Sequence, residues 1–151
     1  MTELAEQGAR GPIEIVDIPD WPGPWPIPDP VDTHYWQAAA VGELLIQECP
    51  ACGRRQHFPR SLCVRCGATP GWRPAAGRGV IYSYTVVRQM GVPPFSERVP
   101  YVVALIDLEE GPRLMGNVVD CAPELVRIGR PVTAVIHRFS PEIAAPQWRL
   151  A

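Results

Sequence analysis

Two short cysteine motifs constrain the fold of this 151-residue chain more than any other feature of its sequence. Cys49 and Cys52 form one C-x2-C motif, Cys63 and Cys66 form a second, and a glycine follows each of them. Two intervening residues let both sulfurs of a turn reach one tetrahedral ion at about 2.3 Å, and the glycine permits a positive φ. The intervening segment is long enough for a small hairpin. The spacing therefore predicts a zinc ribbon with four cysteine ligands.

Three other interpretations of the four cysteines remain open from the sequence. Two disulfides would need an oxidising compartment, whereas the N-terminal residues do not resemble a secretory signal. A redox dithiol usually needs one C-x2-C motif at the start of a helix. Iron in a rubredoxin-like site uses the same ligands as zinc. We favour structural zinc, and four thiolates would leave it no open position for catalysis.

Arginines flank both cysteine motifs, at Arg54, Arg55, Arg60 and Arg65. A Zn(Cys)4 centre carries a formal charge of about −2, because each thiolate contributes one negative charge to the dication. The arginines can offset that charge, or they can bind phosphate groups. The fifth cysteine, Cys121, has no nearby partner in the sequence, and we interpret it as a small buried apolar residue.

Composition excludes several classes of function. All 14 basic residues are arginine, so lysine Schiff-base chemistry and a P-loop lysine are both excluded. The net charge of −2 is unlike that of proteins that bind polyphosphate along their length, so we do not expect nucleic acid as a partner. The longest apolar run, Tyr101 to Ile106, is far shorter than the roughly 20 residues of a transmembrane helix. We expect a cytoplasmic protein that does not bind membranes.

Residues 1–30 are predicted to form a proline-rich arm without helix or strand. Six prolines lie between residues 19 and 30 at nearly every second position, and each favours extended backbone at the residue before it. Trp21 and Trp25 lie inside this stretch. The arm is either a stiff tail that folds onto its own domain or a segment that docks on a partner chain, with the indoles as anchors.

The rest of the chain is predicted to be mainly β, with a short helix over 31–42, the zinc ribbon over 43–74 and a barrel over 75–151. Tyr35 and Trp36 have helical spacing, and we interpret them as packing residues. Strands are predicted over 79–88, 101–108, 113–119, 131–139 and 147–150. Five short strands after a ribbon favour a small closed barrel such as an OB-fold. Val80, Tyr82, Tyr84 and Val86 are expected to share one face of the first barrel strand.

The order of these motifs closely resembles a known family over residues 31–139. The resemblance rests on the paired cysteine motifs, Gly77-Arg78-Gly79 before the first barrel strand, Pro100-Tyr101 at the second, and the Glu110-Gly111-Pro112 turn. The family consists of stand-alone rubredoxin-like zinc-ribbon and OB-fold proteins that associate with thiolase-superfamily enzymes. It implies a short helix, a ribbon and a five-stranded OB-fold barrel, in that order.

The resemblance also implies a function. Family members form complexes with thiolases, hydroxymethylglutaryl-CoA synthases or thiolase-like aldolases, including bacterial retro-aldolases that cleave steroid side chains. The catalytic chemistry belongs to the thiolase-like subunit, and the ribbon–barrel protein helps to bind or channel the coenzyme A part of an acyl-CoA at the shared interface. We therefore expect an accessory subunit with no catalytic residues of its own. The competing hypothesis is a single-stranded nucleic-acid-binding module in which Tyr82 and Tyr84 stack on bases.

Two sets of candidate binding residues follow from this interpretation. Arginine suits the phosphates of coenzyme A, and the candidates beside the first barrel strand and its following loop are Arg78, Arg88 and Arg98. The long turn over residues 91–98 is expected at the barrel rim, where Phe95 could contact a partner. The full set of candidate partner contacts is Trp21, Trp25, Tyr35, Trp36 and Phe95.

Overall fold

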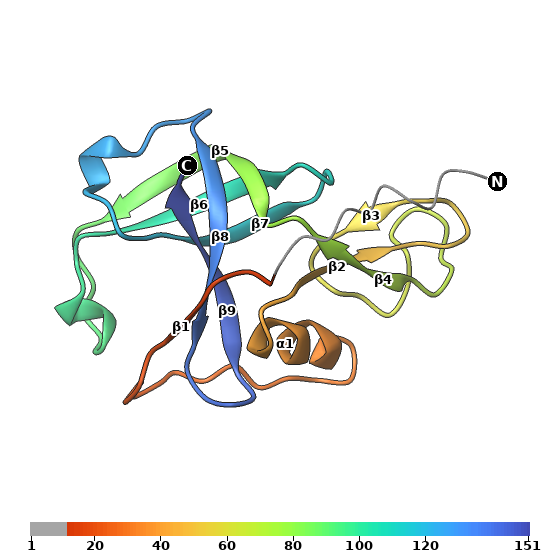
Figure 1. Ribbon diagram of the computed structural model, residues 1–151, viewed down its shortest axis with the longest axis horizontal. Coiled ribbons are helices and arrows are strands. Elements are labelled where there is room, and N and C mark those ends of the chain that lie inside the picture. Colours follow the sequence, from red (N-terminus) through yellow and green to blue (C-terminus); the bar gives the residue numbers. More distant parts are fainter. Residues whose placement is uncertain (1–11) are drawn as a thin grey trace.

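Alternating apolar residues in the C-terminal half form the five strands of a closed barrel in the computed structural model, which describes residues 12–151 (Figure 1). The strands are β5 (Arg78–Val87), β6 (Tyr101–Leu108), β7 (Arg113–Val118), β8 (Pro131–Arg138) and β9 (Ala144–Leu150). Their neighbour order is β8-β5-β6-β7-β9, and a pairing of β8 with β9 closes the barrel. β7 and β9 run parallel where Val118 meets Trp148, and the other pairs are antiparallel. This five-stranded closed order confirms the predicted OB-fold.

The predicted common face of the first barrel strand is wrong. The pairing of β5 with β6 shifts between Ile81 and Ser83, which marks a β-bulge. A bulge adds one residue to a strand and reverses the faces of the residues beyond it. Tyr82 is consequently exposed, whereas Tyr84 packs against the barrel core. The bulge separates the two tyrosines on which the nucleic-acid hypothesis depended.

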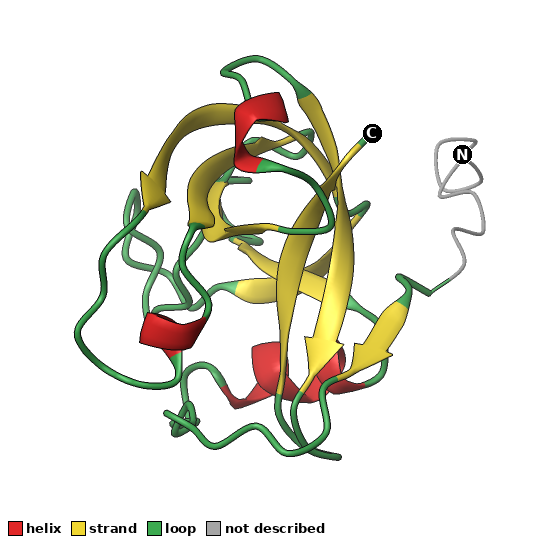
Figure 2. Cartoon of the chain, turned by 90° about the vertical axis from the view of Figure 1, so that its left-hand side faces the viewer, coloured by secondary structure: helices red, strands yellow, loops and turns green. Residues whose placement is uncertain are grey.

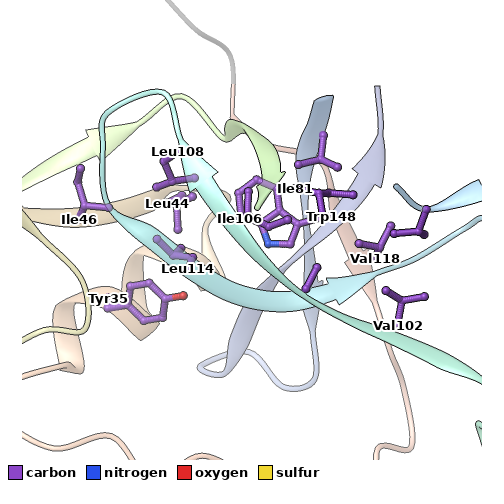
Figure 3. Packing of buried hydrophobic residues seen from close by; sticks show 13 residues of the cluster. Tyr35, Leu44, Ile46, Ile81, Val102, Ile106, Leu108, Leu114, Val118 and Trp148 are labelled. Atoms are coloured by element: carbon purple, nitrogen blue, oxygen red, sulfur yellow. The ribbon is translucent and has the colours of Figure 1, made fainter. Parts of the chain in front are cut away.

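One apolar cluster joins the barrel to the rest of the fold (Figure 3). Trp148 of β9 belongs to it with 0% of its surface exposed, as do Ile106 of β6 and Leu114 of β7. Leu44 and Ile46 of the ribbon belong to the same cluster, as does Tyr35 of the helix. The base of the ribbon and the helix are therefore fixed to the barrel by shared burial of apolar side chains.

The ribbon is a three-stranded antiparallel sheet with β2 (Leu44–Glu48) at its centre, between β3 (Arg55–Gln56) and β4 (Gly71–Ala75) (Figure 1). The sequence indicates β2 from its apolar run. β4 is not predicted, because Gly71 and Pro74 disfavour a strand and its apolar residues do not alternate. β4 forms because β2 offers it a five-residue pairing partner, from Leu44 opposite Ala75 to Glu48 opposite Gly71.

The helix α1 (Thr33–Ala40) is shorter at both ends than the predicted 31–42 and packs on β2, β8 and β9. Gly42 follows the helix with φ of +88°, and its backbone N–H donates to the Ala39 carbonyl at 3.0 Å. Glycine adopts this left-handed conformation without a steric penalty, so it suits the turn from the helix into β2. Within residues 12–151, no helix is long and apolar enough to cross a membrane.

The prediction that residues 1–30 contain no strand is wrong. β1 (Ile15–Asp17) pairs in parallel with β8 and extends the sheet at the edge of the barrel (Figure 2). Ile13 and Ile15 pack against a small cluster that contains Ile136, and the Arg138 Nε donates to the Asp17 carboxylate at 2.6 Å. β1 precedes the proline run, so the prolines do not prevent its pairing. Residues 1–11 of the predicted arm lie outside the described residues.

Candidate metal centre and two adjoining cavities

Two turns of matching geometry carry the four cysteines. In the first turn, the Gly53 N–H donates to the Cys49 carbonyl at 2.8 Å, and in the second the Gly67 N–H donates to the Cys63 carbonyl at 2.9 Å. The φ angles of the two glycines are +72° and +76°, which are left-handed values as the sequence predicts. The repeated backbone conformation directs each pair of sulfurs toward the other pair.

The four sulfurs fit one tetrahedral metal ion. The Sγ atoms of the four cysteines all lie within 4.8 Å of one another. Sγ–Sγ distances are 3.5 Å between Cys49 and Cys66 and 3.7 Å between Cys52 and Cys63. A tetrahedron with metal–sulfur bonds of about 2.3 Å has sulfur–sulfur edges of about 3.8 Å. Backbone N–H groups from Arg65 and Cys66 lower the pKa of the Cys63 thiol to about 6, which favours the thiolate that a metal binds.

A buried pair of amide side chains supports the loop between the cysteine turns, and the sequence analysis did not find it. The Gln56 Nε2 donates to the Gln47 Oε1 at 2.8 Å. The Gln47 Oε1 also accepts from the Arg60 N–H, and the Gln47 Nε2 donates to the Arg60 carbonyl, both at 2.9 Å. The Gln56 Oε1 accepts from the Val64 N–H at 3.0 Å. Glutamine within the apolar stretch that forms β2 is the one signal that could have indicated it.

A basic cavity of about 760 Å³ lies between the ribbon and the β6–β7 turn. Among its arginines, Arg55 pairs with Glu48 and Arg113 pairs with Asp107, at 2.7 and 2.6 Å. The side chains of Arg54, Arg60 and Arg65 make no hydrogen bond or ion pair within residues 12–151, and we call these three the free ribbon arginines. Glu110 also lines the cavity, where its Oε1 accepts from the Ala76 N–H at 2.7 Å.

The three arginines predicted to bind coenzyme A lie apart from this cavity. Arg78 makes two hydrogen bonds of 2.8 Å to the Glu109 carboxylate. Arg88 and Glu124 are both exposed, and their charged groups lie 3.9 Å apart. The Arg98 guanidinium lies over the Trp21 ring at 4.6 Å. Two of the three therefore have carboxylate partners within the chain, and the third stacks on an indole.

A second cavity, of about 730 Å³, opens where α1, the loop between the cysteine turns and the barrel strands β6, β7, β8 and β9 meet. We call it the aromatic cleft, because it is lined by Trp21, Tyr35, Trp36, Phe58, Phe95, Tyr101 and Phe139. The two cavities share His57 and Phe58 in their walls, so they adjoin. Burial lowers the pKa of His57 to about 4, which keeps its imidazole neutral near pH 7.

The predicted partner contacts differ in how accessible they are. Trp21 packs between Phe95 and Phe139, with ring centroids 5.9 and 5.1 Å away, so the arm covers part of the barrel face. Tyr35 is buried and Trp36 packs against the core, which favours the packing role that their spacing indicates. Trp25 is 44% exposed and remains accessible to another molecule.

Acidic and histidine side chains line the two cavities, among them Asp107 and Glu110 in the basic cavity and His137 in the aromatic cleft. Neither cavity is lined by a serine, threonine or cysteine. His34 lies against Trp72 and His57 against Tyr35 and Phe58, with ring centroids 4.7 to 6.0 Å apart.

Comparison with known proteins identifies both parts of the chain. Residues 36–71 match a family model described as the rubredoxin-like zinc ribbon domain of ChsH2, and residues 72–137 match its C-terminal OB-fold domain. A probable enoyl-CoA hydratase alpha subunit of Thermomonospora curvata is 41% identical, over 80% of this chain and 38% of that protein. A DUF35 domain-containing scaffold protein of Methanocaldococcus jannaschii is 39% identical, over 60% of this chain and 65% of that protein. The chain thus spans less than two thirds of either curated relative.

Among solved structures, a chain of the Ltp2-ChsH2(DUF35) aldolase superposes with a TM-score of 0.75 and 37% identity, covering 83% of this chain and 98% of that one. The match covers ribbon and barrel together, in the arrangement described above. On the evidence of the matched domains, the cysteine turns and the barrel order, the chain belongs to the DUF35 family, with the rubredoxin-like zinc ribbon and OB-fold domain of ChsH2.

Proposed function

We propose that the chain is a non-catalytic accessory subunit of a thiolase-superfamily acyl-CoA complex, which stabilises its catalytic partner and helps to bind or channel the coenzyme A moiety. The observation that carries the proposal is the likeness to a chain of the Ltp2-ChsH2(DUF35) aldolase over nearly that whole chain. The relatives named as a hydratase alpha subunit and as scaffold proteins also support a role within an assembly. A retro-aldolase that shortens steroid side chains is one such complex.

The metal of this subunit is structural zinc in our proposal. Cys49, Cys52, Cys63 and Cys66 would supply all four ligands, so the ion would have no open coordination position for substrate or water. Zinc in such a site supplies folding free energy and a fixed loop geometry rather than chemistry. The chain's contribution to the complex is then the surface that the metal holds in place.

Coenzyme A phosphates would bind at the free ribbon arginines in this proposal. Arg54, Arg60 and Arg65 line one cavity and have no carboxylate partner within residues 12–151, whereas Arg78 is held by Glu109. An unpaired guanidinium offers its donors to a phosphate without breaking an existing ion pair. Part of the arginine charge would still offset the negative metal centre, so both interpretations of this cluster contribute.

Co-purification tests the accessory role. The full chain would be expressed with a tag, alone and together with a candidate thiolase-like partner, and retention of that partner would be measured after gel filtration. We expect a stable hetero-oligomer whose acyl-CoA turnover requires the partner. Failure to retain the partner, or turnover of an acyl-CoA by the isolated chain at the rate of the complex, would contradict the accessory role.

Equilibrium binding tests the location of the phosphates. Replacing Arg54, Arg60 and Arg65 together by alanine should weaken coenzyme A binding at least tenfold, which is about 1.4 kcal/mol. Arg88→Ala removes one positive charge at an exposed site outside the cavity and serves as the control. If Arg88→Ala loses more coenzyme A affinity than the triple variant does, the phosphates bind instead at the arginines beside the first barrel strand.

A further inference from the structure

The segment that joins β1 to α1 carries an apolar strip on the outside of the fold (Figure 1). Residues 22–28 consist of four prolines, one glycine, Trp25 and Ile27, so they include no charged side chain. Trp25 is 44% exposed and Ile27 is 91% exposed. Single exposed apolar residues are common on protein surfaces, whereas a continuous apolar segment is characteristic of an interaction site. We call residues 22–28 the proline strip.

Both ends of the proline strip are fixed to the rest of the chain. On the side of β1, the Trp21 ring packs between Phe95 and Phe139, and the Arg98 guanidinium lies over it. On the side of α1, the Asp29 carbonyl accepts from the backbone N–H of Thr33, the first residue of the helix, at 2.9 Å. The strip is therefore held between two anchored points.

The backbone of the strip is also restricted along its length. The Trp21 Nε1 donates to the Pro24 carbonyl at 3.1 Å. Gly23 has a φ of +100°, and a Cβ at this position would lie 3.3 Å from the Trp25 Cδ1, so the indole lies against the turn. Proline at every second position favours extended backbone in the residues between. A partner could bind such a segment without first having to order it, which reduces the entropy lost on association.

The polar groups at the centre of the strip are unused. Residues 25–28 make no hydrogen bond through backbone or side chain within residues 12–151. Their carbonyls are therefore available as acceptors, and the Trp25 Nε1 is available as a donor. Extended proline-rich segments with free carbonyls are recognised by grooves lined with aromatic side chains, which pack on the proline rings and donate hydrogen bonds to the carbonyls.

Negative charges flank the strip and indicate the charge of its partner. Asp20 lies two residues before the strip and Asp29 directly after it, and both residues are exposed. Neither carboxylate makes an ion pair within residues 12–151. The Asp29 Oδ1 accepts from the Val31 N–H at 2.7 Å, which leaves its charge without a cation. A groove complementary to this segment is apolar in the middle and basic at its ends.

We infer that the proline strip docks in an apolar groove of the catalytic subunit, which is lined by aromatic side chains and has basic residues at both ends. Trp21 and Asp32, which lie on either side of the strip in the chain, both line the aromatic cleft, so a protein seated over the mouth of the cleft also reaches the strip. The inference rests on the proposed function, which supplies the catalytic subunit, and extends it by assigning a segment of this chain to the interface.

Affinity measurements with the zinc-loaded full chain and the candidate thiolase-like partner test this inference. The double variant Trp25→Ala/Ile27→Asp removes both apolar side chains of the strip, and it should weaken binding of the partner by about tenfold or more. Ile128→Asp is the matched control, because Ile128 is 68% exposed, lies in the loop before β8 and lines neither cavity. The control should bind the partner within about twofold of the wild type. Circular dichroism and zinc content should be unchanged in both proteins.

A second variant tests the basic ends of the groove. Asp20→Asn removes one flanking charge, and asparagine tolerates the left-handed backbone of this position, where φ is +61°. Added salt screens exposed charges, so the affinity of the wild type for the partner should fall as the salt concentration rises, and the affinity of Asp20→Asn should fall less steeply. An identical salt dependence in the two proteins would overturn the basic groove.

Equal affinities of the wild type and the Trp25→Ala/Ile27→Asp variant would overturn the inference and leave the accessory role intact, since the partner is still bound. An equal loss in the Ile128→Asp control would also overturn it, because the effect would then not belong to the strip. If the double variant loses self-association in sedimentation velocity while its affinity for the partner is unchanged, the strip docks on a second copy of this chain and the inference fails. If the unmodified chain does not retain the partner, the accessory role fails and the inference fails with it.

Discussion

The tip of the ribbon and the barrel are stabilised by different kinds of interaction. Within residues 49–70, the buried side chains are those of Cys49, Cys63 and Gln56, so the tip has no aliphatic core of its own. The barrel instead encloses Trp148 and a full set of aliphatic residues with almost no exposed surface. A segment without an apolar core depends on metal ligands and hydrogen bonds. The contrast predicts that the ribbon tip needs a bound metal ion to fold and that the barrel does not.

Removing one metal ligand should separate the two regions most clearly. We expect Cys52→Ser to lose its zinc and to unfold residues 49–70, while β2 stays packed against the barrel. The effect should be the largest considered, since structural zinc contributes about 10–16 kcal/mol to the folding of small zinc domains. Elemental analysis and amide NMR spectra would measure both consequences. Cys121→Ser is the control, because this cysteine lies outside the cluster. Unchanged zinc content in Cys52→Ser would refute the four-cysteine site.

The reverse experiment removes the centre of the barrel core. Trp148→Ala should destabilise the barrel by about 3–5 kcal/mol, the usual cost of deleting a buried aromatic side chain. The cysteine turns should still bind zinc below the unfolding transition, since their hydrogen bonds are local. Urea unfolding with parallel measurement of zinc release would compare the two regions. In each protein, the urea midpoint of zinc release is compared with the midpoint of barrel unfolding. If the two midpoints coincide in the wild type but differ in the variant, the two regions are coupled differently in the two proteins.

Local sequence signals predicted the parts of the fold that depend on local chemistry. The cysteine spacing and its glycines indicated the metal site, and the strand predicted over 101–108 has the same bounds as the central strand β6. The parts that failed depend on tertiary pairing. β1 exists because β8 lies beside it, and β4 exists because β2 does. Propensity does not encode such partners.

The candidate binding sites show the same division. The free ribbon arginines were noticed because they flank the cysteines, whereas Arg78 seemed available until the fold placed Glu109 beside it, 31 positions away in the chain. The aromatic cleft could not be predicted, because its walls come from the arm, the helix, the ribbon and four barrel strands. Only the folded chain shows which of these aromatic residues meet.

The glutamine pair offers a smaller test of how the tip is held. Gln56→Leu removes the acceptor of the Val64 N–H and the donor to the Gln47 Oε1 in a buried position. An unsatisfied buried polar group costs about 1–3 kcal/mol, so the ribbon tip should open more often without losing its ligands. Zinc transfer to a chelator should accelerate by at least fivefold at unchanged stoichiometry. Leu62→Ala, at an exposed site in the same loop, is the control. If zinc transfers to the chelator at the same rate from Gln56→Leu and from the wild type, the glutamine pair does not hold the ribbon tip closed.

The smallest effect concerns the response of the barrel to acid. Burial lowers the pKa of His137 below its ordinary value; Arg149 and Arg98 lower it further, and Asp120 opposes them. The unfolded chain therefore binds a proton at a higher pH than the folded chain does. Stability from neutral His137 is complete above the unfolded pKa of about 6.5 and is lost as pH falls from there toward the folded pKa.

His137→Gln removes this titration, so the variant should lose less barrel stability than the wild type between pH 7 and pH 5. Urea unfolding followed by tryptophan fluorescence would measure the difference, and zinc content at each pH would report separately on the ribbon, whose thiolates also take up protons in acid. If the free energy of barrel unfolding depends on pH identically in the two proteins, protonation of His137 does not destabilise the barrel in acid. A shared loss that follows zinc release would then assign the acid response to the metal-held tip, which is the opposite of the division between the two regions argued above.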